Sequence, residues 1–111
     1  MWAPVTVDPN GSGTIYIASI GGGVRKSTDY GVTWSNAGLG NLAVYGFAMD
    51  AAGPDHVYAG VFTSDDVITS GVYKSDDGGV TWNRVATGIP WMITADPNIL
   101  GTVYAAGLEA R

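Results

Sequence analysis

Short runs of alternating apolar and polar residues follow one another along the chain, separated by clusters of Gly, Pro, Asp, Asn and Ser. This spacing is typical of half-buried β-strands joined by turns. The longest stretch without Gly is residues 89–100, and it contains Pro90 and Pro97, so no position offers three undisturbed turns of helix. The pattern predicts an all-β fold. The predicted strands are residues 3–7, 14–20, 23–26, 32–35, 45–49, 56–62, 71–74, 80–86, 91–95 and 102–106.

The strands belong to an internal repeat. The segment STDYGVTW, residues 27–34, returns as SDDGGVTW at residues 75–82. A second segment occurs three times, around the Asp and Tyr pairs Asp8 and Tyr16, Asp50 and Tyr58, and Asp96 and Tyr104. We therefore divide the chain into a first four-stranded unit at residues 1–42, a second at 43–90, and the first half of a third at 91–111.

A four-stranded antiparallel unit of this length is typical of a β-propeller blade, whose faces are buried only by neighbouring blades. The chain then holds about two and a half blades, whereas propellers close with four to eight. Two explanations are open. Either the chain is a fragment or engineered piece of a longer propeller, or several copies associate as a homo-oligomer that completes the ring.

The pattern Ser-x-Asp-x-Gly-x-Thr-Trp predicts a turn between two strands. The Asp side chain is expected to accept backbone N–H groups inside the loop, and the Gly to supply a positive φ. The Thr resumes the strand, and the Trp enters the core between blades. The residues assigned to this structural role are Ser27, Asp29, Gly31, Thr33 and Trp34, and Ser75, Asp77, Gly79, Thr81 and Trp82.

At these residues the chain resembles the Asp-box, or bacterial neuraminidase repeat, propellers. The segment DPN-x-x-GTVYAAG, residues 96–107, resembles repeats of sialidases, xyloglucanase-type glycoside hydrolases, sortilin-like receptors and photosystem II assembly factors. The resemblance implies that the Asp boxes are structural turns on the face away from the ligand. It also favours an extracellular or periplasmic location, although no signal peptide is present in this chain.

Composition and charge limit the partners and cofactors that we expect. The net charge is −5, and five Lys and Arg residues do not provide a phosphate-binding face, so nucleic acid is not expected as a partner. No run is apolar over the ~20 residues that a membrane span requires. The chain has no Cys, and its single His gives no basis for a metal site or a hydrolase triad, so we expect neither a metal nor another cofactor.

The second unit alone carries an enlarged loop, residues 62–70, with the adjacent carboxylates Asp65 and Asp66. Strand alternation places this loop on the face opposite the Asp boxes, which the resemblance makes the ligand-binding face. Asp65 and Asp66 are therefore the candidate acid and base residues, and a solvated acidic loop tip is the alternative. Trp91 and Tyr45 are candidates for stacking on a sugar, and core packing is the alternative.

Glycosidases need two carboxylates about 5–9.5 Å apart, and adjacent residues of one loop rarely provide that separation. A second carboxylate would therefore have to come from another chain. Sialidase activity is not expected, because Arg25 and Arg84 stand next to the Asp boxes rather than in a cluster. The preferred interpretation is a structural or interaction module related to carbohydrate. The alternatives are a fragment of a xyloglucanase-like glycoside hydrolase and an oligomeric propeller lectin.

Overall fold

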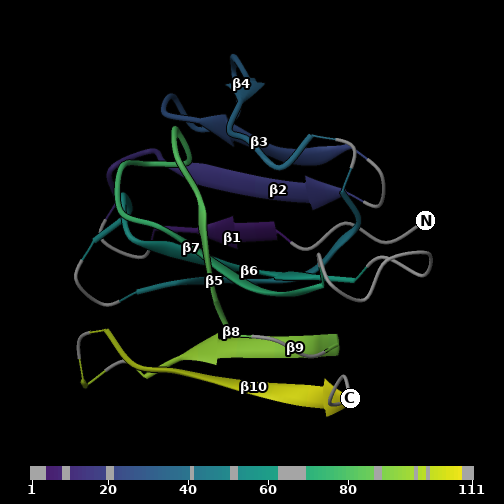
Figure 1. Cartoon of the computed structure of the whole chain (residues 1–111). Helices are drawn as coiled ribbons and strands as arrows, with labels where there is room; N and C mark the ends of the chain where they lie inside the picture. The colour runs from purple at the N-terminus through teal and green to yellow at the C-terminus, as the bar shows by residue number, and fades with distance from the viewer. Residues whose placement is uncertain are drawn as a thin grey trace.

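The computed structural model describes residues 5–8, 11–19, 22–40, 42–50, 53–62, 70–86, 89–96, 98–99 and 101–108. Within these ranges the protein is all-β and has no helix, as the sequence pattern predicts. Two four-stranded antiparallel sheets and one two-stranded sheet follow one another along the chain (Figure 1). The first sheet contains β1 (Val5–Val7), β2 (Ile15–Ser19), β3 (Gly23–Ser27) and β4 (Ser35–Asn36). The second contains β5 (Val44–Met49), β6 (Val57–Val61), β7 (Gly71–Ser75) and β8 (Asn83–Ala86). The third contains β9 (Ile89–Ala95) and β10 (Val103–Leu108).

Each sheet is a meander in which neighbouring strands are consecutive in the sequence. The predicted fourth strands begin too early, because β4 and β8 start at Ser35 and Asn83 rather than at residues 32 and 80. Val32 and Val80 have strong strand propensity, but both lie in the preceding turn and are 79% exposed. Hydrogen bonding to the turn Asp, described below, overrides that propensity.

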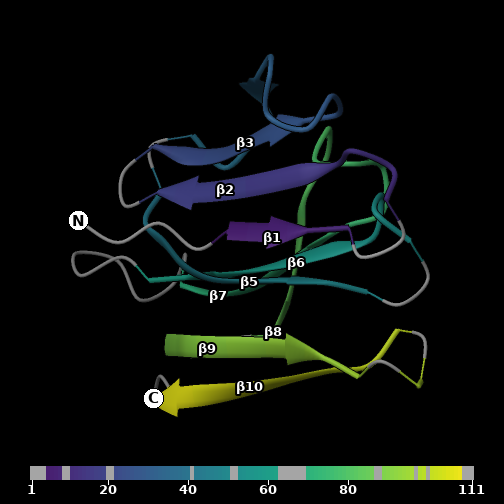
Figure 2. The same ribbon diagram turned by 180° about the vertical axis from the view of Figure 1, so that it is seen from behind.

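The three sheets pack one after another in the order in which they occur in the sequence (Figures 1 and 2). Strands β1 and β2 contact β5, and β5 and β6 contact β9. The core lies between the first two sheets and is made of small and branched residues with a few aromatic rings. Its buried members are Tyr16, Ala18, Val24, Ala37, Val44, Phe47, Val57, Ala59 and Val61.

An aromatic stack joins the first sheet to the second. Tyr16 of β2 is fully buried, and its ring stacks on Phe47 of β5 with centroids 5.1 Å apart. Trp82 meets Phe47 edge-on at 6.3 Å. Contacts of this kind are worth about 0.5–1.5 kcal/mol beyond the burial of apolar area. The three rings therefore fix how one sheet is seated on the next.

Trp82 also makes a polar link across the same boundary. Its indole Nε1 donates to the carbonyl of Ala37, just beyond β4, at 2.8 Å. Gly38 and Gly79 let the two backbones approach at this point. A Cβ on Gly38 would stand 2.5 Å from Trp82 Nε1, and one on Gly79 would stand 2.8 Å from Ala37 Cβ.

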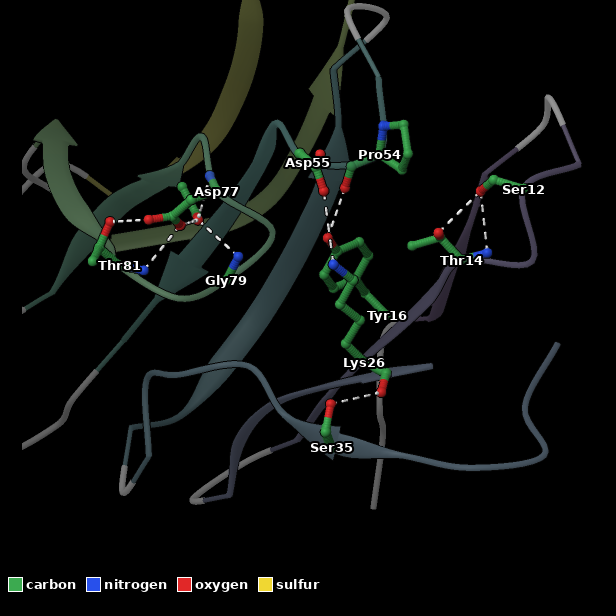
Figure 3. A network of polar contacts seen from close by, with 11 residues as sticks. Ser12, Thr14, Tyr16, Lys26, Ser35, Pro54, Asp55, Asp77, Gly79 and Thr81 are labelled. Carbon is green, nitrogen blue, oxygen red and sulfur yellow. Dashed lines mark hydrogen bonds and ion pairs between the residues drawn. The ribbon is translucent and has the colours of Figure 1, made fainter. Parts of the chain in front are cut away.

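Further polar contacts tie successive sheets at their turns (Figure 3). The Tyr16 hydroxyl donates to the Pro54 carbonyl at 2.6 Å, and Lys26 Nζ lies 3.7 Å from Asp55 Oδ1. Burial, followed by the charges of Asp55 and Asp77, raises the pKa of Tyr16 to about 12, so the hydroxyl remains a donor. Between the second and third sheets, Asp50 Oδ2 accepts the N–H of Gly101 at 2.8 Å.

The contact between Gly38 and Trp82 yields a stability prediction. Gly38→Ala should lower the free energy of unfolding by about 2–4 kcal/mol, because the new methyl group meets the indole and φ at this position is +89°. The measurement is urea denaturation followed by tryptophan fluorescence. Gly40→Ala is the matched control, since nothing lies within 4 Å of a Cβ there, and its effect should stay within about 0.5 kcal/mol. Equal losses in the two variants would contradict the role assigned to Gly38.

Candidate functional site

The turn between β3 and β4, residues 27–34, is held by its own side chains. Ser27 Oγ donates to Asp29 Oδ1 at 2.7 Å and accepts the N–H of Gly31 at 2.8 Å. Asp29 Oδ1 also accepts the N–H of Thr33 at 2.8 Å, and Asp29 Oδ2 accepts the Thr33 hydroxyl at 2.5 Å. Trp34 Nε1 donates to the Gly31 carbonyl at 3.0 Å. The carboxylate thus bonds only to groups of its own turn in these contacts.

The turn between β7 and β8, residues 75–82, repeats this arrangement (Figure 3). Ser75 donates to Asp77 at 2.8 Å, and Asp77 accepts the backbone and hydroxyl of Thr81 at 2.9 and 2.5 Å. Both turns place two consecutive residues in the left-handed region. These are Tyr30 and Gly31 in the first turn, at φ 60° and 91°, and Gly78 and Gly79 in the second, at 73° and 93°.

Tyr30 occupies a conformation that usually favours Gly. Its hydroxyl donates to the Gly11 carbonyl at 2.7 Å, and its N–H donates to the Gly13 carbonyl at 3.0 Å. In the second turn the N–H of Gly78 donates to the Asp55 carbonyl at 3.0 Å. Each repeat turn is therefore anchored on the turn that follows the first strand of the same sheet, so both kinds of turn share one edge of the molecule.

The hydrogen bonds also set the ionisation of the turn carboxyls. Bonds from the side chain and backbone of Thr33, then from Ser27, lower the pKa of Asp29 from the usual 3.8 to about 2. Thr81 and Ser75 lower the pKa of Asp77 to about 2 in the same way. Both groups are ionised at neutral pH and accept hydrogen bonds from the turn, which is a structural use of the charge rather than acid or base chemistry.

One exposed polar cluster lies at the same edge. His56 Nδ1 is 2.9 Å from Asp76 Oδ1, and Lys74 Nζ is 3.5 Å from the same oxygen. Hydrogen bonding to His56, together with the nearby Lys74, lowers the pKa of Asp76. Exposed ion pairs of this kind contribute little to stability. Over the described ranges, no three His, Asp or Glu side chains gather closely enough to hold a metal ion.

The opposite edge of the sheets carries the aromatic candidates. Tyr45 lies in β5 where the register shifts, because Val44 pairs with Val61 and Gly46 pairs with the next residue back, Gly60. Trp91 occupies the same kind of position in β9. Its neighbours Pro90 and Met92 pair with the adjacent residues Gly107 and Ala106, so the register shifts at Trp91. Both residues are thus the extra residue of a β-bulge in the first strand of their sheets.

The two bulges are equivalent positions of the repeat. Counting back from the pairs Met49–Val57 and Ala95–Val103, which close the two sheets at the other edge, Tyr45 and Trp91 occupy the same place. A bulge bends its strand and redirects the side chain of the extra residue, and bulges are over-represented beside functional sites. The sequence signal for this equivalence was the common spacing from the repeated Asp, which is Asp50 in one unit and Asp96 in the next.

Tyr45 is only partly buried and has an aromatic neighbour that sequence reasoning missed. The ring of Phe62, which follows β6, lies 5.9 Å from the Tyr45 ring at an interplanar angle of 53°. The backbone N–H of Phe62 donates to the Ala43 carbonyl at 3.1 Å, so the two segments are tied together. Two aromatic side chains therefore stand together at the edge opposite the repeat turns. Asp65 and Asp66 follow Phe62 in the sequence but lie outside the described residues.

Comparison with solved structures places this geometry among propeller enzymes. The GH74 xyloglucanase from Xanthomonas campestris matches with a TM-score of 0.72 and 30% identity, over 97% of this chain and 16% of that chain. The chain is similar to part of a GH74 propeller. The GH74 enzyme of Niastella koreensis matches with a TM-score of 0.73 and 23% identity, over 98% of this chain and 17% of that chain, and supports the fold alone. No protein-family model and no curated protein matches the chain.

The chain therefore spans about a sixth of the GH74 enzymes that it resembles. This partial coverage is consistent with a segment of a propeller whose remaining blades are not part of the given sequence. The Asp-box assignment stays a resemblance carried by the two turns. In the part of the protein that the structure covers, no helix is both long and apolar enough to cross a membrane.

The turn carboxyls yield a pH prediction. Because folding lowers the pKa of Asp29 and Asp77 from 3.8 to about 2, their contribution is complete above about pH 5 and is lost as the pH falls from about 4 to 2. The double variant Asp29→Asn with Asp77→Asn should be less stable than the parent at pH 7, and this difference should shrink toward pH 2. Thermal melting at pH 7, 4, 3 and 2 measures it. A difference in melting temperature that stays constant over this range would contradict the assigned role.

Proposed function

We propose that this chain is a glycan-binding segment of a GH74-type propeller, and that it contacts a neutral polysaccharide such as xyloglucan at the edge opposite the repeat turns. The observation that carries this proposal is the equivalence of Tyr45 and Trp91, each the extra residue of a bulge in the first strand of its sheet. A repeated aromatic position suits a repeated ligand, because successive sugar rings of a polysaccharide present similar apolar faces to aromatic side chains.

Charge supports a neutral ligand. The chain carries a net charge of −5, which would repel an acidic polysaccharide. Arg25, the closest Arg to the first repeat turn, lies in β3, and Arg84 lies in β8, where its Nη1 donates to the Ser70 carbonyl at 3.4 Å. The two Arg residues lie in different sheets. They do not form the cationic cluster that would bind a sugar carboxylate.

The similarity to a xyloglucanase at 30% identity favours this polysaccharide class. Binding without turnover is the role that we assign to the segment itself, as in a lectin or a structural module. Hydrolysis is the second candidate function, and it depends on Asp65 or Asp66 as one of the acid and base residues, with the second carboxylate coming from another chain. The blades missing from a closed ring would come from a longer chain or from further copies of this one.

Binding is tested by titrating the chain with xyloglucan oligosaccharides and following heat or tryptophan fluorescence. Tyr45→Ala and Trp91→Ala should each weaken binding by about tenfold, equivalent to about 1.4 kcal/mol for one lost aromatic contact. Tyr30→Ala is the matched control, since it removes a 69% exposed aromatic ring from the other edge and should leave affinity unchanged. If Tyr45→Ala and Trp91→Ala bind the oligosaccharide as tightly as Tyr30→Ala does, the proposed location of the binding edge is contradicted.

Hydrolysis is tested by incubating the chain with xyloglucan and measuring reducing ends. If copies of the chain assemble a catalytic centre that uses one of these carboxylates, release of reducing ends should fall by at least a hundredfold in Asp65→Asn or Asp66→Asn. Asp55→Asn removes a carboxylate at the opposite edge and should leave the rate unchanged. Activity that persists in both loop variants would exclude Asp65 and Asp66 as acid and base.

A further inference from the structure

The rings of Tyr45 and Phe62 form a pair at the edge opposite the repeat turns. Their centroids are 5.9 Å apart and their planes are tilted by 53°. Both side chains are only partly buried, so each residue is in part packed against protein and in part open to solvent. A tilted aromatic pair at this distance is an attractive contact, beyond the apolar area that it buries. Phe62 therefore restricts how the Tyr45 ring can lie.

The position of Phe62 is fixed by the sheet. Phe62 directly follows β6, and its backbone N–H donates to the Ala43 carbonyl at 3.1 Å. Its neighbour Val61 pairs with Val44 of β5, and both of these residues are fully buried. The ring of Phe62 thus extends from a backbone position that is anchored to the strand carrying Tyr45.

Tyr45 lies at a place where such a support matters. The register of β5 and β6 shifts there, and a bulge redirects the side chain of its extra residue. The next residue, Gly46, pairs with Gly60, so neither member of that pair offers a side chain against the Tyr45 ring. A side chain that is immobilised only on binding costs affinity. A neighbouring ring that limits the Tyr45 rotamers before the glycan arrives reduces that cost.

The third unit carries a different residue at the position of Phe62. Leu108 of β10 pairs with the residue two positions before Trp91. Phe62 bonds to the residue two positions before Tyr45, so Leu108 and Phe62 are equivalent in the repeat. Leucine is therefore the replacement with which to test Phe62, because it keeps an apolar side chain and removes the ring.

We propose that Phe62 is a positioning residue, which holds the Tyr45 ring in the orientation that stacks on a sugar and does not itself touch the glycan. This inference rests on the proposed function, because it needs a glycan at this edge. It adds that the two equivalent edge aromatics differ. The orientation of Tyr45 is set in advance by a neighbouring ring, whereas the unit of Trp91 has a leucine at that position.

The test is a double-mutant cycle between positions 62 and 45, in which xyloglucan oligosaccharides are titrated into the chain and the heat is measured. Phe62→Leu should weaken binding by about two- to tenfold, the equivalent of one aromatic pair. In a chain that already carries Tyr45→Ala, Phe62→Leu should cause no further loss, because the ring that it positions is gone. Phe62→Tyr keeps a ring and should bind within about twofold of the parent. Urea denaturation of each variant checks that the chain stays folded.

The ring contact is measured separately, without glycan. Proton NMR records the tyrosine ring signals, and the signal of Tyr45 is assigned by its absence in Tyr45→Phe. This signal should shift in Phe62→Leu, since the ring current of Phe62 is lost. Tyr30→Ala, a change at the other edge, is the control and should leave the signal in place. A Tyr45 signal that does not respond to Phe62→Leu would overturn the proposal.

The glycan titrations separate this inference from the proposed function. If Phe62→Leu weakens binding equally with and without Tyr45→Ala, Phe62 acts directly on the glycan, so positioning is wrong and the glycan-binding edge stands. If Tyr45→Ala weakens binding and Phe62→Leu does not, the inference is wrong and the edge again stands. If Tyr45→Ala itself leaves affinity unchanged, the proposed edge is wrong and the inference falls with it.

Discussion

The structure depends on one constraint: a four-stranded sheet of this composition cannot bury both of its faces by itself. Stacking of Tyr16 on Phe47 meets that need between the first two sheets, and Trp82 adds a third ring and a hydrogen bond to Ala37. The small residues around these rings, Ala18, Ala37 and Ala59, allow the close approach. In the first and third sheets, Val5 and Tyr104 are 58% and 56% exposed.

Polar interactions are organised differently from the apolar ones. The bonds of Asp29 and Asp77 are local and close each turn on itself, so both turns form the same way in different sheets. The contacts of Tyr16 with Pro54 and of Asp50 with Gly101 cross from one sheet to the next. Local bonds thus shape each blade edge, and a few long-range bonds fix its position. At the opposite edge, the rings of Tyr45 and Phe62 contact each other.

Sequence patterns predicted the strands and the repeat because these depend on spacing along the chain. They misplaced the starts of β4 and β8, because the turn Asp, which was expected to bond inside its loop, binds Thr33 and Thr81. These bonds extend the turn past Val32 and Val80, where strand propensity is high. The bulges at Tyr45 and Trp91 depend on cross-strand register, which the sequence of one strand does not carry. Likewise, the partner of Trp82 is Ala37, a residue of the preceding sheet, and no local pattern joins them.

The pairing of Gly38 with Trp82 has a consequence for how such chains can be recombined. Gly38 belongs to the first sheet and Trp82 to the second, and the space left by the missing side chain of one is filled by the indole of the other. Duplication or exchange of whole blades at residue 42 would separate Gly38 from Trp82. Each would then face a residue that does not fit it. At the position of Gly38, the second unit has Ala86. Residues that face each other across a boundary between two blades must therefore be kept together when blades are recombined. We expect such residues to change in matched pairs as the blades of one chain diverge.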